Sequence, residues 1–468
     1  MFKNCRIIFD IVSFIIIVSC STNRTDPLYV FSEPNNKPVL PNDQNRVETS
    51  QARLERLIAY NYYKKLFPSF SVGVFDRRGF LYTYYISSDQ NKQYSTGSVT
   101  KLLTATLLQI QLERQRLQPL ENIDRYFEDL SQLRWNHTPI TIQNLVTHTA
   151  GFPDLRFYKT TDLIKIESID LKVPMPIYPP GQHYRYSNHG YIILGHILEK
   201  TCGNTIDNCI KREIFEPLGM TESKGPTTGA GGYVTSLQDL MLFGRMYLNG
   251  GRANGRIILS QNSIADMVVP GFYIPPSQHR FYTGRGWRVR TTGKQVTTMF
   301  HIGGANYTSA WLQLFPPYNV GICYLGNPPK YNSQLESFLV AVQYMLADVA
   351  GAYANSNQPI NTWSPDQPNP KLAEQYSGIY RNSLTKDELQ VEWQTIDTKT
   401  ETKESQLTII SKEQQEYNLL PETHQVFIGG KKFVSHQFVI EPNTNKVIAI
   451  ANSDGYYVKQ SDLTSVSN

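Results

Sequence analysis

The chain has 468 residues, a length that favours more than one domain and excludes a single small module. Its 45 Lys and Arg against 40 Asp and Glu give a formal net charge of +5, and 18% of its residues are charged. This balance argues against a nucleic-acid-binding surface and against a highly charged disordered chain. Hydrophobic residues make up 40% of the chain, so we expect a folded protein with a sizeable core and no nucleic-acid partner.

The N-terminal segment, residues 1–20, has the pattern of an export signal. Lys3 and Arg6 precede an apolar run from Ile11 to Val18, which is too short to cross a bilayer because a spanning helix needs about 20 apolar residues. The tetrapeptide IVSC that ends at Cys20 resembles a bacterial lipobox, whose cysteine becomes the lipidated first residue after cleavage. An ordinary signal peptide with an incidental cysteine is the alternative.

The polar, Pro- and Asn-rich residues 21–50 are typical of a tether. We therefore expect an exported protein that is attached to the membrane through a lipid on Cys20. Its globular part would lie in the bacterial cell envelope, facing the periplasm if the cell is Gram-negative.

Residues 51–354 have the pattern of an α/β layer with a helical insertion. The stretch from Phe70 to Tyr85 predicts two strands joined by a tight turn, and Trp311 to Leu325 predicts a second hairpin. Helical spacing is found at Val99 to Leu112, Ile192 to Lys200, Leu237 to Leu248 and Leu335 to Ala350. Strands early and late with helices between them favour one sheet built from both ends of this region.

The C-terminal part has a different pattern. Residues 355–369 are rich in Pro and poor in apolar residues, which indicates a linker. Residues 370–468 contain short alternating or apolar segments separated by polar turns, as at Leu389 to Trp393 and Val447 to Ala451. This spacing predicts a small all-β domain.

The cysteines outside the N-terminal segment are Cys202, Cys209 and Cys323, a set too sparse for a disulfide framework or a zinc site. Cys202 and Cys209 are either bridged or separate buried thiols, and Cys323 lies in an apolar run that predicts a core position. His148 and His189 have no Cys or carboxylate at metal-ligand spacing, so we expect hydrogen-bonded scaffold residues and no metal or cofactor.

Ser98 and Lys101 form the motif S-x-x-K at the start of an apolar helix. Their spacing places the amine one turn from the hydroxyl on the same face. A serine becomes a nucleophile when a neighbouring base takes its proton, and a helix N-terminus favours the oxyanion that forms. A helix cap followed by a surface lysine would give the same pattern.

Two later segments carry groups that would complete such a site. Tyr186 and Asn188 lie in the sequence YSN, where a phenol can shuttle a proton and an amide can bind a substrate carbonyl. His301, Gly303 and Gly304 lie in HIGG before the late hairpin, where glycines let a substrate backbone approach closely. Alone, these segments also fit a packed Tyr, a helix cap and a β-bulge.

Together and in this order, the three segments resemble the S-x-x-K, Y-x-N and K/H-x-G motifs of the serine β-lactamase and penicillin-binding protein superfamily, in its class C-type branch of β-lactamases, D-peptidases and esterases. The resemblance extends to LVTHTAG at residues 145–151, to IFEPLGM at 214–220 and to the segment 231–251, and covers roughly residues 54–350.

The resemblance implies an α+β fold, with a mixed sheet packed by helices, a helical subdomain and an active site between them. It implies that Ser98 is acylated and that Lys101 and Tyr186 move the proton, with the principal base left open. Asn188 and His301 would bind the substrate, while main-chain donors at Ser98 and Gly304, beside Gly303, would face the oxyanion. No cofactor or metal is implied.

The chain has His301 where β-lactam-specialised members have Lys, and an ordinary His is mostly neutral at pH 7. Substrates with a free carboxylate should bind less well unless an Arg elsewhere substitutes. The sequence thus favours a serine hydrolase that acts on an amide or ester, such as a D-amino-acid peptide derived from peptidoglycan. A true class C-like β-lactamase and a non-catalytic peptidoglycan- or protein-binding relative are the alternatives.

Overall fold

The computed structural model describes residues 5–7, 18–20, 44–153, 163–272, 274, 281–305, 307–330, 332–354, 356, 360, 375–382, 388–397, 403–410, 416–421, 426–429, 434–440, 446–452 and 455–461. Most of the expected apolar signal run, residues 21–43 of the tether and all of the linker but residues 356 and 360 lie outside them. The two short strands near the N-terminus, β1 (Cys5–Ile7) and β2 (Val18–Cys20), pair with each other. Within the described residues, no helix is both long and apolar enough to cross a membrane.

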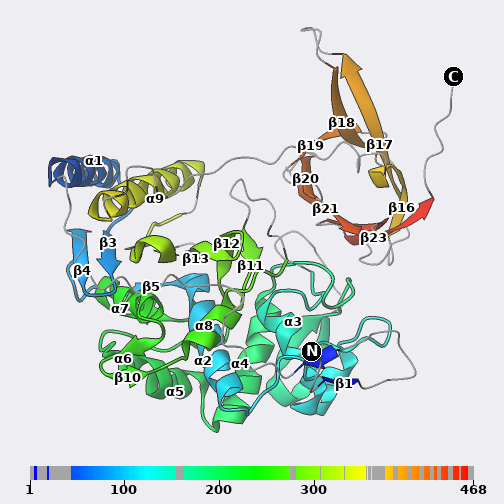
Figure 1. Cartoon of the computed structure of the whole chain (residues 1–468), viewed down its shortest axis with the longest axis horizontal. Coiled ribbons are helices and arrows are strands. Elements are labelled where there is room, and N and C mark those ends of the chain that lie inside the picture. The colour runs from blue at the N-terminus through cyan, green and yellow to red at the C-terminus, as the bar shows by residue number, and fades with distance from the viewer. Residues whose placement is uncertain are drawn as a thin grey trace.

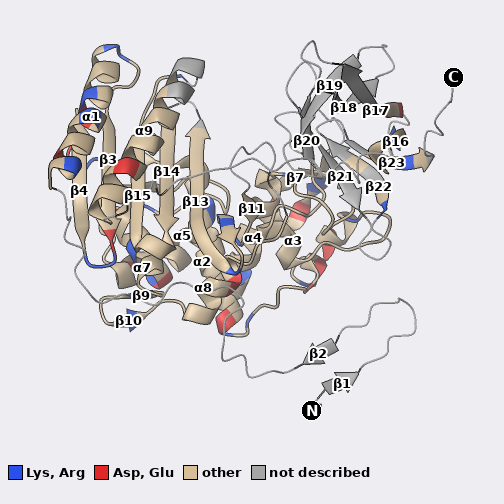
Figure 2. Cartoon of the chain, turned by 45° about the horizontal axis from the view of Figure 1, so that its top comes forward, with Lys and Arg blue, Asp and Glu red and all other residues tan. Residues whose placement is uncertain are grey.

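One antiparallel sheet organises the larger part of the molecule. Its strands follow in the order β11-β12-β13-β14-β15-β3-β4, so the early hairpin lies beside the late one (Figure 2). The expectation of one sheet from both ends is confirmed, but all its neighbouring strands pair antiparallel and the sheet is therefore not mixed. The strands are β3 (Phe70–Asp76), β4 (Phe80–Ile86), β11 (Tyr282–Thr283), β12 (Arg288–Thr292), β13 (Gln295–Ala305), β14 (Thr308–Phe315) and β15 (Val320–Gly326).

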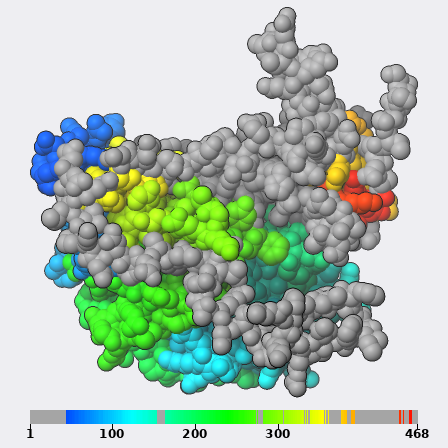
Figure 3. Space-filling model, in the orientation of Figure 1, coloured from blue at the N-terminus to red at the C-terminus, as the bar shows by residue number. Residues whose placement is uncertain are grey.

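The central strands β3 and β15 are buried on both faces, since every residue of each is buried and successive side chains of a strand point to opposite sides. On β3, Val72 and Val74 pack in the cluster formed with α1 (Gln44–Tyr63) and α9 (Ser333–Tyr353). Phe75 belongs to the cluster on the other face, with α7 (Leu237–Leu248). At Gly73, a Cβ would lie 2.6 Å from Met241 Sδ, so α7 packs directly on the strand. Helices α1 and α9 lie side by side (Figures 1 and 3).

The segment between β4 and β11 is mainly helical, and its central helix is α2 (Thr100–Glu113). Every residue of α2 from Thr100 to Gln111 is buried. The expected helices at residues 99–112, 192–200, 237–248 and 335–350 are all present. The helix expected at residues 192–200 is α4 (Asn188–Cys202), and the other α-helices of the described part of this region are α3 (Ile142–Val146), α5 (Ile206–Ile210), α6 (Glu216–Leu218) and α8 (Gln261–Met267). Two-stranded sheets accompany them: β5 (Tyr94–Ser95) with β8 (Val234–Thr235), β6 (Leu163–Ile166) with β7 (Leu171–Pro174), and β9 (Arg252–Ala253) with β10 (Arg256–Ile257).

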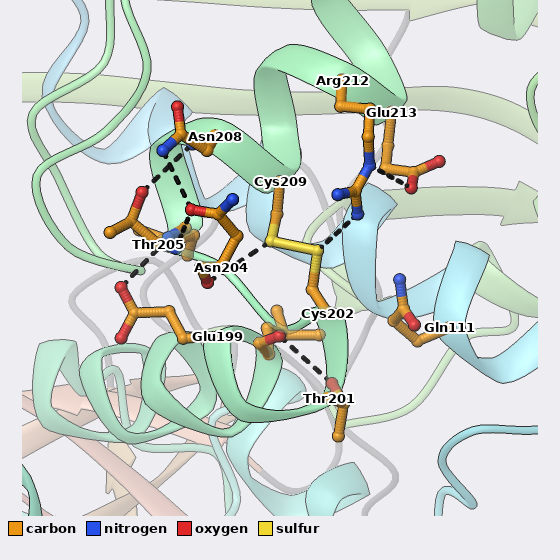
Figure 4. Close-up of a disulfide and its surroundings, with 12 residues drawn as sticks. Gln111, Glu199, Thr201, Cys202, Asn204, Thr205, Asn208, Cys209, Arg212 and Glu213 are labelled. Carbon is orange, nitrogen blue, oxygen red and sulfur yellow. Dashed lines mark hydrogen bonds and ion pairs between the residues drawn. A yellow bond between two sulfur atoms is a disulfide. The ribbon is translucent and has the colours of Figure 1, made fainter.

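Cys202 and Cys209 form a disulfide between the end of α4 and α5 (Figure 4). Arg212 donates to the Cys202 sulfur across 2.8 Å, and Thr205 caps α5 through the Asn208 amide. The sequence left the pairing open, and the structure resolves it. Cys323 is a free, fully buried thiol on β15, so its predicted core position is confirmed.

The C-terminal strands close into a separate antiparallel sheet, so the expected all-β segment is present (Figure 1). Tyr380 lies at its start, where its buried hydroxyl donates to Tyr376 O across 2.6 Å. The strands are β16 (Gly378–Asn382), β17 (Glu388–Asp397), β18 (Lys403–Ile410), β19 (Glu416–Pro421), β20 (Val426–Gly429), β21 (Val434–Ile440), β22 (Val447–Asn452) and β23 (Gly455–Ser461).

Candidate active site

Ser98 lies in a short 3-10 helix (Gly97–Val99) that continues into α2. Two hydrogen bonds of Thr100 fix this turn: its hydroxyl donates to Gly97 O across 2.6 Å and accepts from Tyr233 N across 3.3 Å. Thr96 N in turn donates to Tyr233 O across 3.0 Å. The Ser98 side chain is therefore held at the start of a buried helix and stays half-exposed, as a nucleophile must.

Lys101 is fully buried on α2, and its amine has three acceptors around it. Lys101 Nζ lies 3.3 Å from Ser98 Oγ, 2.8 Å from Asn188 Oδ1 and 3.0 Å from Ala230 O. A buried lysine needs such partners because the desolvation of an unpaired amine is costly. Lys101 also lies over the rings of Tyr186 and Tyr191, 5.0 and 5.5 Å from their centroids. The amine is thus directed at the Ser98 hydroxyl.

Tyr186 lies just before α4, and its hydroxyl donates to Ser98 Oγ across 2.6 Å. The imidazole of His148 stacks on the Tyr186 ring at 4.5 Å, and its Nδ1 accepts from Ser187 N across 3.1 Å. Burial, with the nearby Lys101 and His301, holds the pKa of His148 well below its usual range, so the ring is neutral and can accept this bond. The prediction that His148 is a hydrogen-bonded scaffold residue is confirmed, and its contacts fix the position of Tyr186.

Strand β13 passes directly beside the Ser98 turn. A Cβ on Gly303 would lie 1.8 Å from Thr96 O and 3.1 Å from Ser98 N, so only glycine permits this approach. On the other side of the contact, a Cβ on Gly97 would lie 3.4 Å from Gly304 N. The main-chain amides of Ser98 and Gly304 therefore belong to two backbones in van der Waals contact, and Gly304 is exposed.

His301 is buried on β13, and its Nδ1 donates to Ile302 O across 2.8 Å. Burial, with the charges of Arg288 and Lys101, holds the pKa of His301 well below its usual range. The side chain is therefore neutral at pH 7, as the sequence predicts for an ordinary histidine. Burial and the two nearby cations keep it neutral further below pH 7 than an ordinary histidine would be.

A narrow pocket joins the tyrosine side of the site to β12 and β13. It is lined by residues that include His148, Tyr186, Arg288 and His301. The space open to the centre of a water molecule is about 10 Å³, so the pocket has room for about one water. Aromatic side chains pack beside it in one cluster, which includes Tyr184, Phe281 and Phe300.

The structure brings together every residue that the sequence nominates for the catalytic centre: Ser98, Lys101, Tyr186, Asn188, His301, Gly303 and Gly304. Asn188, nominated as a substrate-binding residue, is exposed but also bonds Lys101. Sequence reasoning missed Ala230 O as an acceptor, and it missed Arg288. The glycines on both sides of Ala230 were the available signal for the first, because they allow a close backbone approach.

Comparisons with known proteins agree with this arrangement. A family model described as Beta-lactamase matches residues 52–337. Penicillin-binding protein 4* of Bacillus subtilis (strain 168) is 29% identical over 143 residues, which cover 29% of this chain and 31% of that protein. This sequence match thus spans about a third of the relative's own length.

Two solved structures show the same fold. The octameric penicillin-binding protein homologue from Pyrococcus abyssi has a TM-score of 0.56 at 18% identity, covering 87% of this chain and 100% of that one. A crystal structure of SurE with D-Leu has a TM-score of 0.59 at 17% identity, covering 89% of this chain and 100% of that one. The predicted fold class is therefore confirmed.

Proposed function

Because this chain belongs to the Beta-lactamase family and is thereby a serine hydrolase, we propose that it cleaves an amide or ester bond of a D-amino-acid peptide or ester through an acyl-enzyme on Ser98. The observation that supports this proposal most strongly is the meeting of a hydroxyl, a phenol and an amine at one point. The Tyr186 hydroxyl is 2.6 Å and the Lys101 amine 3.3 Å from Ser98 Oγ.

In the first half of the reaction, Tyr186 acts as a phenolate that has lost its own proton to solvent. Ser98 Oγ attacks the carbonyl carbon and loses its proton to this phenolate. Collapse of the tetrahedral intermediate breaks the bond to the leaving nitrogen or oxygen, which receives that proton from Tyr186. In the second half, water attacks the ester on Ser98 and gives its proton back through the same phenol. Each transfer needs a hydrogen bond of about 2.6–3.2 Å, which the Tyr186 contact meets.

The surroundings of Lys101 favour Tyr186 as the proton carrier. An ammonium has three N–H donors and no acceptor, and Ser98 Oγ, Asn188 Oδ1 and Ala230 O match those donors. A protonated Lys101 beside the phenol would stabilise the phenolate that accepts the Ser98 proton. The contacts of Lys101 therefore favour Tyr186 as the base, a choice that the sequence leaves open between these two residues.

The oxyanion would be stabilised by the main-chain amides of Ser98 and Gly304. Gly303 supports this role, because its lack of a side chain keeps the two backbones in contact. Donors that are already fixed before reaction stabilise the developing charge without reorganisation. Asn188 would orient the substrate through the part of its amide that faces solvent, while its oxygen holds Lys101.

His301 is buried and neutral where β-lactam-specialised relatives have a lysine, so it favours a D-amino-acid amide or ester without a free carboxylate over a β-lactam, which carries one. The relatives named above include penicillin-binding proteins, and the SurE structure contains D-Leu. Peptidoglycan-derived peptides are therefore the substrate class that we propose.

Intact-mass measurement after exposure to a fluorophosphonate tests the nucleophile. We expect one adduct per chain in the wild-type protein and none in Ser98→Ala. The absence of an adduct with a fluorophosphonate, a penicillin and a p-nitrophenyl ester would overturn the proposal and favour a binding protein. A stable penicillin adduct or rapid hydrolysis of nitrocefin, with no cleavage of D-peptides, would favour a β-lactam-directed protein.

We also propose that the protein is exported and anchored in the membrane by a lipid on Cys20. The basic residues, apolar run and lipobox-like tetrapeptide support this proposal, as does the Cys202–Cys209 disulfide, since such bonds persist in oxidising compartments. In a bacterial host, radiolabelled palmitate should be incorporated into the wild-type protein and not into Cys20→Ser. Equal labelling of both would refute the anchor.

A further inference from the structure

Helix α1 has one side that is open to solvent. Exposed residues recur there every three or four positions and so form one stripe along the helix: Asn45, Thr49, Ala52, Arg56, Tyr60 and Tyr63. Arg53 and Lys64 are exposed beside this stripe, and we call all these residues together the α1 face. Its tyrosines are strongly exposed, Tyr60 to 61% and Tyr63 to 80%.

The charged groups of the α1 face are all cations. Among the described residues, no carboxylate forms an ion pair with Arg53, Arg56 or Lys64. Lys64 Nζ instead lies over the Tyr60 ring, 5.5 Å from the centroid. These positive charges therefore remain open to an anionic partner.

The acidic residues of α1 lie outside the α1 face. Glu55 accepts from the Tyr82 hydroxyl across 3.0 Å, and Glu48 accepts from Gln44 Nε2 across 3.1 Å. The field over the α1 face is therefore set by its cations, which attract a surface of negative charge.

An open hollow lies on this side of the molecule, where α1 meets α9. The space open to the centre of a water molecule is about 300 Å³, and the lining includes Asn45 and Arg53 of the α1 face. The carboxylate that lines it, Asp348, is already engaged by the Ser50 hydroxyl across 2.6 Å and by Arg46. The hollow thus has room for a phosphate group beside Arg53.

The open surface continues onto α9. Val340 and Tyr344 are exposed and lie eight and four positions before Asp348, so the three residues share one side of that helix. Because Asp348 borders the hollow, these apolar groups flank the α1 face. Exposed tyrosine rings favour the headgroup level of a membrane, and Lys and Arg are attracted to anionic lipids. The composition of this surface therefore fits a lipid interface.

The proposed lipid anchor would hold the α1 face close to a membrane. Residues 21–43 separate Cys20 from Gln44, where α1 begins, and a chain of this length spans at most about 80 Å. A surface tethered within that distance meets the membrane at a high effective concentration, so contacts too weak to hold a free protein become sufficient. A lipid and a basic patch are two signals that together give stable attachment.

We propose that the α1 face docks on the surface of an anionic phospholipid membrane, with Arg53, Arg56 and Lys64 at the phosphate groups. This inference goes beyond the proposed hydrolase function. Helices α1 and α9 pack on one face of the sheet, whereas Val99, next to Ser98, belongs to the cluster on the other face. A membrane on the α1 face would therefore leave the candidate active site open to substrate.

Co-sedimentation of the full chain with lipid vesicles tests this inference. The chain carries Cys20→Ser, so that no lipid is attached at that residue. The vesicles contain either phosphatidylcholine alone or equal amounts of phosphatidylcholine and phosphatidylglycerol. We expect binding to the anionic vesicles to be at least about tenfold tighter. Arg53→Gln with Arg56→Gln should weaken that binding about 25-fold, because each cation at an anionic surface contributes about fivefold.

Two further double variants are matched controls. Arg53→Lys with Arg56→Lys keeps both charges and should stay within about threefold of the wild-type affinity. Arg252→Gln with Arg256→Gln removes the same charge from exposed positions on β9 and β10, far from α1 in both Figure 1 and Figure 2. It should likewise stay within about threefold, because salt screens charges that lie far from the bound surface. An unchanged melting temperature checks that each variant is folded.

Equal binding to the two kinds of vesicle, no binding to either, or equal losses in the two Gln variants would overturn the inference. So would a dimer that forms without lipid and is lost in Arg53→Gln with Arg56→Gln, since it would assign the α1 face to a second copy of the chain. Binding is measured without turnover and without a lipid on Cys20. Its failure is therefore distinguishable from failure of the hydrolase proposal and of the anchor proposal.

Discussion

Replacement of Gly303 with alanine tests the contact between β13 and the Ser98 turn. The new Cβ would lie 1.8 Å from Thr96 O, whereas real Cβ atoms stay beyond about 3.0 Å, so the strand must move away by about 1.2 Å. Such a shift separates the Ser98 amide from the Gly304 amide. Because a displacement of about 1 Å at a reacting centre can reduce a rate about a hundredfold, we expect kcat/KM to fall by about this factor.

The loss should appear mainly in kcat, because the oxyanion donors act on the transition state. Hydrolysis of a p-nitrophenyl ester and the rate of Ser98 labelling by a fluorophosphonate measure the effect, and thermal unfolding checks that the variant is folded. The Cβ added by Gly79→Ala would have no atom within 4 Å, so this variant should keep the wild-type rate. A Gly303→Ala protein that labels and turns over within about threefold of wild type would refute the oxyanion argument.

Three further substitutions probe the proton, the charge and the pH dependence. Tyr186→Phe removes the 2.6 Å hydrogen bond to Ser98 and should reduce kcat by about a hundred- to ten-thousandfold without a change in melting temperature, and a near-normal rate would remove the phenol from the mechanism. His301→Lys should raise the ratio of kcat/KM for carboxylate-bearing over neutral esters by about tenfold, and an unchanged ratio would contradict the charge argument. Burial and the nearby Arg185 lower the pKa of His183 to about 3, so the unfolded chain, with a pKa of about 6.5, binds the extra proton. The free energy of unfolding is therefore unaffected by His183 above about pH 6.5 and decreases as the pH falls toward 3. The decrease is about 2 kcal/mol at about pH 5. Denaturant unfolding at about pH 7.5 and about pH 5 measures this loss. It should appear in the wild-type protein and in His137→Asn, a control at an exposed histidine, but not in His183→Leu. Equal losses in all three proteins would contradict the role of His183.

Local patterns in the sequence predict the regular elements well. The apolar spacing over residues 237–248 matches α7 at both ends, because Ser236 caps the helix and the apolar face repeats without interruption. The two hairpins are likewise set by alternating apolar residues and by turns at Asp76 and Pro316. The residues of the catalytic centre were nominated from short motifs whose spacing is also local.

Features that depend on distant contacts could not be predicted. Helix α1 starts at Gln44, within the expected tether, where Val47 is buried and the buried Ser50 donates to Asp348 on α9, from the other end of the region. The Cys202–Cys209 bridge depends on the direction of the chain after α4. Arg288 has no motif around it, and only the pairing of β12 with β13 places it beside the site.

The neighbourhood of β3 and β15 has a consequence for the order of folding. These strands pair through residues 70–76 and 320–326, so the central contact of the sheet closes one of the longest loops in the chain. Proteins dominated by such non-local contacts fold slowly. During synthesis Ser98 emerges early, whereas Gly304 on β13 and the paired strand β15 emerge long afterwards, so we expect a nascent chain to lack the proposed oxyanion site until then.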